Sequence, residues 1–169
     1  MSSVTVTPGR LEGTLTPPPS KSAAHRALLC AALAGSGTVR GLELSDDIAA
    51  TRDAVAALGV QTATTEVSGR VNIHLSSAPP PQETVVDCRE SGTTLRLMLP
   101  LLAARGVKAT LIGRGRLPQR PLGAYTALFP DHGISLTYPD DGRSLPLRLC
   151  GRLTAGRFAL AGDVSSQFV

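Results

Sequence analysis

The sequence predicts an α+β fold built from a repeated unit, with two units complete and a third that starts near residue 162. One indication is a short polar loop that leads into a very apolar helix and recurs roughly every 70 residues, at 19–26, 89–96 and 162–169. Another is the set of strand-like segments that follow the helices after a glycine. The third is composition, because 42% hydrophobic and 18% charged residues are typical of a globular chain.

In the first unit, the pattern predicts an extended start, two helices and three strands. Pro17 to Pro19 exclude a helix, and Ser20 or Ser22 can cap the helix that follows. That helix is apolar on every side, so we expect it to be buried at the centre of the fold. The expected elements are an extended segment over 1–16, helices over 22–34 and from Ser45 to Gly59, and strands over 38–44, 60–65 and 71–75.

The second unit repeats this plan. A proline inside its first helix, Pro100, should kink or shorten that helix. A second proline, Pro121, fits the first turn of the next helix. The expected elements are strands over 85–87, 107–112, 134–138, 145–149 and 158–160, and helices over 95–104 and from Pro121 to about Gly133.

Composition also excludes several classes of protein. No apolar run reaches the roughly 20 residues that a membrane span needs, and the first residues lack the features of a secretory signal. Three widely spaced cysteines fit reduced thiols in the cytoplasm better than a disulfide framework or a zinc site. Three scattered histidines do not predict a metal site. Aromatic residues make up only 3%, so stacking on nucleic acid has little support.

The polar loops carry the chemistry that the sequence predicts. The start of a helix presents free backbone N–H groups and a positive dipole end, which together attract anions. Hydroxyls, amides, glycines and cations gather there, so we expect a ligand with several anionic groups. The alternative is that each loop is only a helix cap with solvated charge. The residues concerned are Ser20, Lys21, Ser22 and Arg26, then Gly92 with its neighbours, Arg120, and finally Ser165, Ser166 and Gln167.

These motifs resemble the 5-enolpyruvylshikimate-3-phosphate (EPSP) synthase family. The resemblance rests on the segments 19–29, 91–96, 117–121 and 162–168, in the family's order and spacing, and it covers only about the first two-fifths of a family member. It implies an enolpyruvyl transferase-like fold of two similar domains, each of three βαβαββ units with helices buried inside mixed sheets. Residues 1–16 would then belong to the second domain, and 17–169 to an incomplete first domain with units at about 17–80 and 81–160.

The resemblance implies transfer of the enolpyruvyl group of phosphoenolpyruvate to the 5-hydroxyl of shikimate 3-phosphate, without a metal or an organic cofactor. This is a step of the shikimate pathway toward aromatic amino acids. Both substrates carry a phosphate and a carboxylate, which arginine and lysine recognise well. The roles implied are catalysis between the two substrates for Lys21, binding of shikimate 3-phosphate by Ser22, Arg26, Ser165, Ser166 and Gln167, and contact with phosphoenolpyruvate, where glyphosate also competes, for Gly92 and Arg120.

Two residues depart from the family pattern, since Glu90 and His25 each replace a frequent asparagine. A carboxylate at Glu90 is unfavourable beside an anion unless an arginine pairs with it, and we assign no role to His25. The acid/base carboxylates of the family come from later parts of its chain. We therefore expect these 169 residues alone to bind substrates weakly and not to turn over.

Three alternatives remain open from the sequence. The related transferase that acts on a UDP-sugar has a Lys-Asn pair and a reactive cysteine where this chain has Lys21-Ser22 and no cysteine. A non-catalytic RNA- or phosphate-binding module would use the arginines and would show salt-dependent affinity. A half that works only with a complementary C-terminal chain is the third.

Overall fold

In the computed structural model, helices and strands follow one another in the same order twice. The structure describes residues 3–10, 12–160 and 167. The first half contains α1 (Lys21–Leu33), β1 (Gly37–Leu42), α2 (Asp46–Ala54), the 3-10 turn η1 (Val55–Leu58), β2 (Val60–Val67) and β3 (Arg70–Ser77). The second half contains β4 (Glu83–Asp87), α3 (Gly92–Arg105), β5 (Lys108–Ile112), η2 (Leu117–Gln119), α4 (Gly123–Leu128), η3 (Pro130–His132), β6 (Ile134–Thr137) and β7 (Leu147–Gly151).

The two sheets share one strand order. The first sheet is antiparallel with the order β1-β3-β2, and the second has the order β4-β5-β7-β6. In the second sheet β4 and β5 are parallel, whereas β7 is antiparallel to both β5 and β6. The strands β1, β3 and β2 thus correspond to β5, β7 and β6, and the second sheet has β4 in addition. The predicted α+β fold of repeated units is confirmed.

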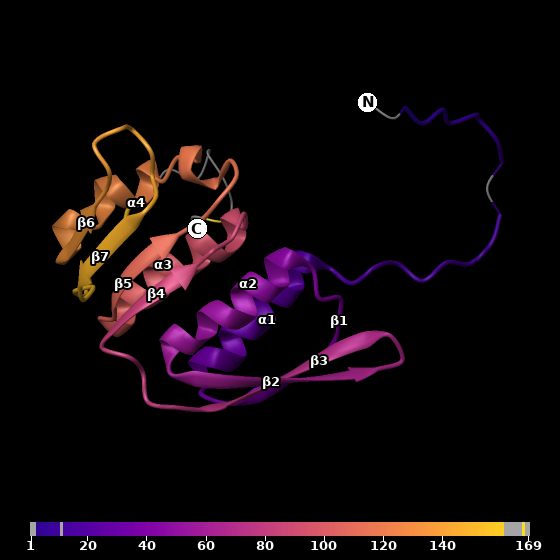
Figure 1. The fold of residues 1–169 in the computed structure, drawn as a ribbon, viewed down its shortest axis with the longest axis horizontal. Helices are drawn as coiled ribbons and strands as arrows, with labels where there is room; N and C mark the ends of the chain where they lie inside the picture. The colour runs from indigo at the N-terminus through magenta and orange to yellow at the C-terminus, as the bar shows by residue number, and fades with distance from the viewer. Residues whose placement is uncertain (1–2, 11, 161–166, 168–169) are drawn as a thin grey trace.

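The helices of the two halves pack together beside the sheets. In Figure 1, α1 and α2 lie against one face of the sheet β1-β3-β2, and α3 runs beside β4 and β5. One continuous cluster of buried apolar side chains joins the halves, with Leu28 on α1, Ile48 on α2 and Leu99 on α3 fully buried. Each such side chain contributes about 1.5–3 kcal/mol relative to an exposed one. This shared core fixes the starts of the three helices relative to one another.

The burial of α1 differs from the prediction. One face carries the buried residues Ala24, Leu28, Leu29 and Ala32, whereas the side chain of Leu33 and the thiol-bearing Cys30 are exposed. The expectation that α1 is buried on every side is therefore wrong for the part of the chain that the structure describes. The reason is that the first sheet, α2 and η1 cover only one side of this helix.

Helix α3 starts earlier than predicted and continues through its proline. The Ser91 side chain accepts the N–H of Thr94 at 3.1 Å, so Gly92 is already the first helical residue. Pro100 has no N–H for the carbonyl of Arg96, four residues earlier in the helix. The hydroxyl of Tyr125 donates to that carbonyl at 2.9 Å. A hydrogen bond from α4 thus takes the place of the missing helical bond, and α3 is not shortened.

Two predictions near the end of the chain are also wrong. Residues 158–160 form no strand, because the ring of Phe158 stacks on His132 with ring centroids 4.0 Å apart. This contact holds the segment against η3 and away from the sheet. Helix α4 begins at Gly123, two residues after Pro121, and its last turn tightens into η3 before Gly133.

The outer edge of β1 carries a β-bulge. The pairing of β1 with β3 shifts between Val39 and Leu42, and Gly41 there has a φ of 72°. Its N–H donates to Oδ1 of Asn72 at 3.0 Å. Within 3–10 and 12–160, no strand pairs with this outer edge. The described residues before α1 are neither helix nor strand, and in Figure 1 they extend away from the sheets.

Candidate functional site

The starts of α1, α2 and α3 lie together, and each is capped by a serine. Ser20, Ser45 and Ser91 each accept the N–H of the residue three positions later. The ammonium of Lys21 lies 3.1 Å from Oδ2 of Asp47 and so joins the first turns of α1 and α2. The side chain of Lys21 remains 61% exposed, which leaves it accessible to a ligand.

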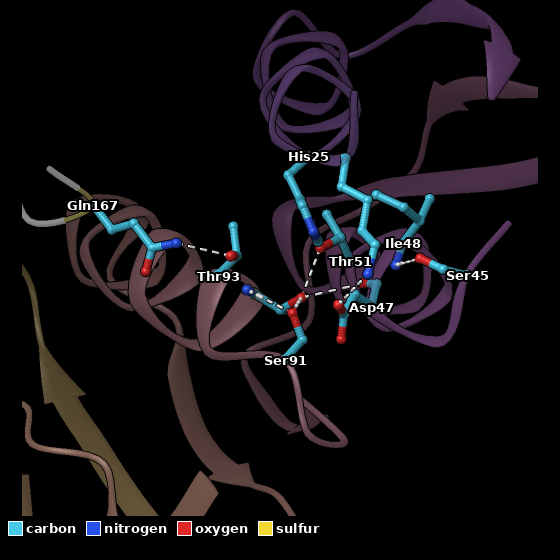
Figure 2. A network of polar contacts seen from close by, with 10 residues as sticks. His25, Ser45, Asp47, Ile48, Thr51, Ser91, Thr93 and Gln167 are labelled. Carbon is cyan, nitrogen blue, oxygen red and sulfur yellow. Dashed lines mark hydrogen bonds and ion pairs between the residues drawn. The ribbon is translucent and has the colours of Figure 1, made fainter. Parts of the chain in front are cut away.

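A buried chain of hydrogen bonds connects the same three helices (Figure 2). Nδ1 of His25 on α1 lies 2.6 Å from Oγ1 of Thr51 on α2. That hydroxyl lies 2.7 Å from Oγ1 of Thr94 on α3, which in turn donates to Oγ of Ser91 at 2.8 Å. All four side chains are buried. Thr94 is one of the neighbours of Gly92 in the predicted anion-binding loop, whereas nothing in the sequence singles out Thr51.

Burial sets the charge of His25. Loss of hydration lowers the pKa of its imidazole below the ordinary value. The nearby Lys21 and Arg26 lower this pKa further, whereas Asp47 opposes them. Burial therefore favours the neutral form of this imidazole.

Arg120 lies against the start of α3. A Cβ added to Gly92 would stand 2.9 Å from Nη1 of Arg120, so only the absence of a side chain lets the guanidinium approach this closely. The side chain of Arg120 forms no hydrogen bond or ion pair with any residue that the structure describes, and its backbone N–H donates to the carbonyl of Leu117 at 3.0 Å. Burial, and then the charge of Arg120, lower the pKa of Arg96, which places two guanidinium groups near one helix start. Such an arrangement favours an anionic ligand.

Gln167 reaches the same helix from far along the chain. Its Oε1 accepts from Nη1 of Arg96 at 2.8 Å. Its Nε2 donates to Oγ1 of Thr93 at 2.9 Å, a contact that Figure 2 shows. The side chain thus lies on the first turns of α3. The predicted residues Ser165 and Ser166 fall outside the described residues.

The remaining predicted site residues lie on the exposed side of α1. The carbonyl of Ser22 accepts from Nη1 of Arg26 at 3.2 Å, and both residues are exposed. Lys21 borders a hollow of about 230 Å³ between α1 and α2, whereas Arg120 borders a separate hollow of about 450 Å³. The carboxylate of Asp47 pairs with Lys21 and its carbonyl lies 3.5 Å from Oγ1 of Thr94, so Lys21 is close to the first turn of α3. Lys21 and Arg120 therefore border two separate hollows on either side of the helix starts.

The carboxylate of Glu90 packs against Gly115. A Cβ on Gly115 would overlap this carboxylate. Glu90 forms no ion pair within the described part of the chain, so no arginine there offsets its charge. Arg89, a candidate for that pairing, instead bonds Asp46 at 3.4 Å and Asp53 at 2.9 Å.

Sequence reasoning did not identify Thr93 and Arg96 as the partners of Gln167. Arg96 stands at the same place in its unit as Arg26, which was the available signal. The partnership itself spans 71 residues of sequence and depends on how the repeats pack.

Comparison with known proteins agrees with the motifs. Residues 6–169 match the family described as EPSP synthase (3-phosphoshikimate 1-carboxyvinyltransferase). Similar curated proteins are the 3-phosphoshikimate 1-carboxyvinyltransferases of Clostridium beijerinckii, 38% identical, and Clostridium kluyveri, 40% identical. Each alignment covers 100% of this chain but only 40% and 39% of the relative, so the chain spans about two-fifths of their length.

A solved structure supports the fold. The EPSP synthase of Acinetobacter baumannii superposes with a TM-score of 0.72 at 23% identity, over 92% of this chain and 36% of that one. Among the described residues no helix is long and apolar enough to cross a membrane. The match over nearly all of the sequence shows that the chain belongs to the EPSP synthase family.

Proposed function

We propose that this chain takes part in transferring the enolpyruvyl group of phosphoenolpyruvate to the 5-hydroxyl of shikimate 3-phosphate, with release of phosphate. The observation that carries the proposal is the guanidinium of Arg120 against Gly92, at the positive end of α3. Family membership supports the same reaction. We place the reaction in the cytoplasm and assign it no metal or cofactor.

Phosphoenolpyruvate is proposed to bind at the start of α3. Its carboxylate and phosphate are anions, and Gly92 leaves room for Arg120 to contact one of them. Glyphosate would compete at the same place. The carboxylate of Glu90, which lies against Gly115 and forms no ion pair among the described residues, would weaken binding there through like-charge repulsion.

Shikimate 3-phosphate is proposed to bind along the start of α1. Ser22 and Arg26 would hold it from the exposed side of the helix, with Ser165, Ser166 and Gln167 on the other side. Gln167 already lies on α3 through its bonds to Thr93 and Arg96, which supports a position between the two ligands.

Lys21 is proposed as the catalytic cation between the substrates. Its bond to Asp47 is exposed to solvent, and an exposed pair of this kind contributes only about 0–1 kcal/mol. A substrate phosphate or carboxylate can therefore displace Asp47 at low cost. The reaction exchanges the bond from C2 of phosphoenolpyruvate to the phosphate oxygen for a bond to the hydroxyl oxygen, and the hydroxyl proton leaves with phosphate. Lys21 and Arg120 would contribute by orienting and neutralising the reacting anions.

Domain organisation is part of the proposal. Residues 17–169 would form part of one domain, with units at about 17–80 and 81–160 and a third from near 162, and residues 1–16 would join a second domain. The acid/base groups of the family would then come from outside these residues. We infer that the chain alone binds both substrates weakly and does not turn over.

A phosphate-release assay tests the function. The chain is measured alone and mixed with a second polypeptide that carries the remaining part of the Clostridium beijerinckii relative. We expect no release from the chain alone, release from the mixture, and none from a mixture with Lys21→Ala. Release at a normal rate by the isolated chain would refute the need for a second part. Failure of the mixture, together with no binding of either substrate by NMR titration, would refute the function.

A further inference from the structure

The buried hydrogen-bond chain of His25, Thr51, Thr94 and Ser91 has a fixed direction. Thr94 is the donor at its far end. Its single hydroxyl proton goes to Oγ of Ser91 at 2.8 Å, because the carbonyl of Asp47, at 3.5 Å, is too distant to compete for it. Thr51 must then donate to Thr94 across 2.7 Å. It follows that His25 donates its Nδ1–H to Thr51 across 2.6 Å.

This direction determines what Ser91 can do. Oγ of Ser91 accepts two hydrogen bonds, from the N–H and from the hydroxyl of Thr94. Since a hydroxyl has two lone pairs, both are occupied and only its own proton remains to donate. No residue that the structure describes accepts this proton. Ser91 is 3% exposed, so an acceptor for this proton, whether water or ligand, has to approach it from the start of α3.

The position of Ser91 identifies the acceptor. It directly precedes Gly92, against which Arg120 lies, so an anion held by Arg120 at the start of α3 would be within reach. We propose that the Ser91 hydroxyl is a further donor to the phosphoenolpyruvate anion, and that His25, Thr51 and Thr94 are positioning residues that orient it. This inference rests on the proposed function. His25 thereby has a role, because it is the first donor of the hydrogen-bond series and extends from α1.

The inference makes a prediction that needs no ligand. Nitrogen-15 NMR of the 169-residue chain reports which imidazole nitrogen carries the proton. We expect neutral His25 to be protonated on Nδ1. If His25 carried its proton on Nε2 alone, Nδ1 would accept from Thr51 and every hydrogen bond in the series would reverse. Ser91 would then donate its proton to Thr94, and the proposal would be wrong.

A ligand titration tests the positioning role. The chain is saturated with shikimate 3-phosphate and titrated with phosphoenolpyruvate while amide shifts are followed. Thr51→Val keeps the shape of the side chain and removes the hydroxyl, so we expect phosphoenolpyruvate to bind about tenfold more weakly. Thr51→Ser should restore binding, and affinity for shikimate 3-phosphate should stay within about twofold. Ser91→Ala should weaken phosphoenolpyruvate at least as much.

A matched control separates positioning from general stability. Thr65→Val removes another Thr–His hydrogen bond, the 3.0 Å contact with His74 on the first sheet, and should leave phosphoenolpyruvate affinity unchanged. If the wild-type chain binds both substrates and Thr51→Val binds phosphoenolpyruvate equally well, this inference alone fails. If the wild-type chain binds neither substrate, the proposed function fails with it.

Discussion

The pairing of Tyr125 with Pro100 leads to a quantitative prediction about α3. Replacing Tyr125 with Phe removes only the hydroxyl and keeps the ring contact with Phe129, whose centroid lies 5.0 Å away. Tyr125 is 3% exposed, so water cannot replace the lost donor to the Arg96 carbonyl. We expect the free energy of unfolding to fall by about 1–2 kcal/mol. Urea unfolding followed by circular dichroism measures this change.

A double-mutant cycle tests the reason for the loss. Pro100→Ala restores an N–H at the position from which an α-helix bonds the Arg96 carbonyl. In that background, Tyr125→Phe should cost about 1 kcal/mol less than in the wild type. Equal costs in the two backgrounds, within about 0.5 kcal/mol, would refute the compensation.

A matched tyrosine provides the control. The hydroxyl of Tyr138 is buried without a hydrogen-bond partner among the described residues. Tyr138→Phe should therefore be neutral or slightly stabilising, because it removes an unsatisfied polar group. A loss as large as that of Tyr125→Phe would show that removing any tyrosine hydroxyl is costly here, whatever its partner.

Three further outcomes follow from the structure. Gly92→Ala should weaken phosphoenolpyruvate about tenfold in NMR titrations, because the new Cβ displaces the Arg120 guanidinium, and unchanged affinity would contradict the proposed contact. Burial raises the pKa of Cys88 from 9.0 to about 12, so stability present below pH 9 is lost as pH rises toward 12, by about 2 kcal/mol at pH 10.5. In urea titrations at several pH values, the free energy of unfolding of Cys88→Ala should fall less steeply with pH than that of the wild type. An identical slope would show that the Cys88 thiol is not the cause of the decline. The pKa of His25 is lowered, so the free energy of unfolding is highest above pH 6.5 and decreases as the solution is acidified. His25→Asn should remove this pH dependence. If the dependence persisted, another group would be responsible for it.

Local chemistry made much of the fold predictable. The helix starts at Ser20 and Ser45 were placed correctly within about a residue, because a capping side chain acts on the N–H three positions away. The start at Ser91 was missed since Gly92 and its hydroxyl neighbours resemble a ligand loop. The same motif serves both as a cap and as a binding surface.

Contacts between distant segments could not be predicted in this way. The stacking of Phe158 on His132 overrode a short apolar run that favoured a strand over 158–160. The bond from Tyr125 to the Arg96 carbonyl spans 29 residues and reversed the expected effect of Pro100. For the site, the family motifs identified residues at the starts of α1 and α3, whereas the buried chain through Thr51 depends on how three helices pack. The individual ligand roles stay predictions.

The bulge in β1 has a consequence for how the chain behaves at high concentration. An uncovered strand can recruit another molecule and start the growth of fibrils, and this tendency increases with the length of regular backbone on offer. Here Gly41 turns its N–H toward Asn72, so regular backbone ends after Val39, three residues into the strand that starts at Gly37. So short a template gives an incoming strand few bonds along β1, and we expect templated growth on the first sheet to start from the eight-residue edge of β2 (Val60–Val67) and not from β1.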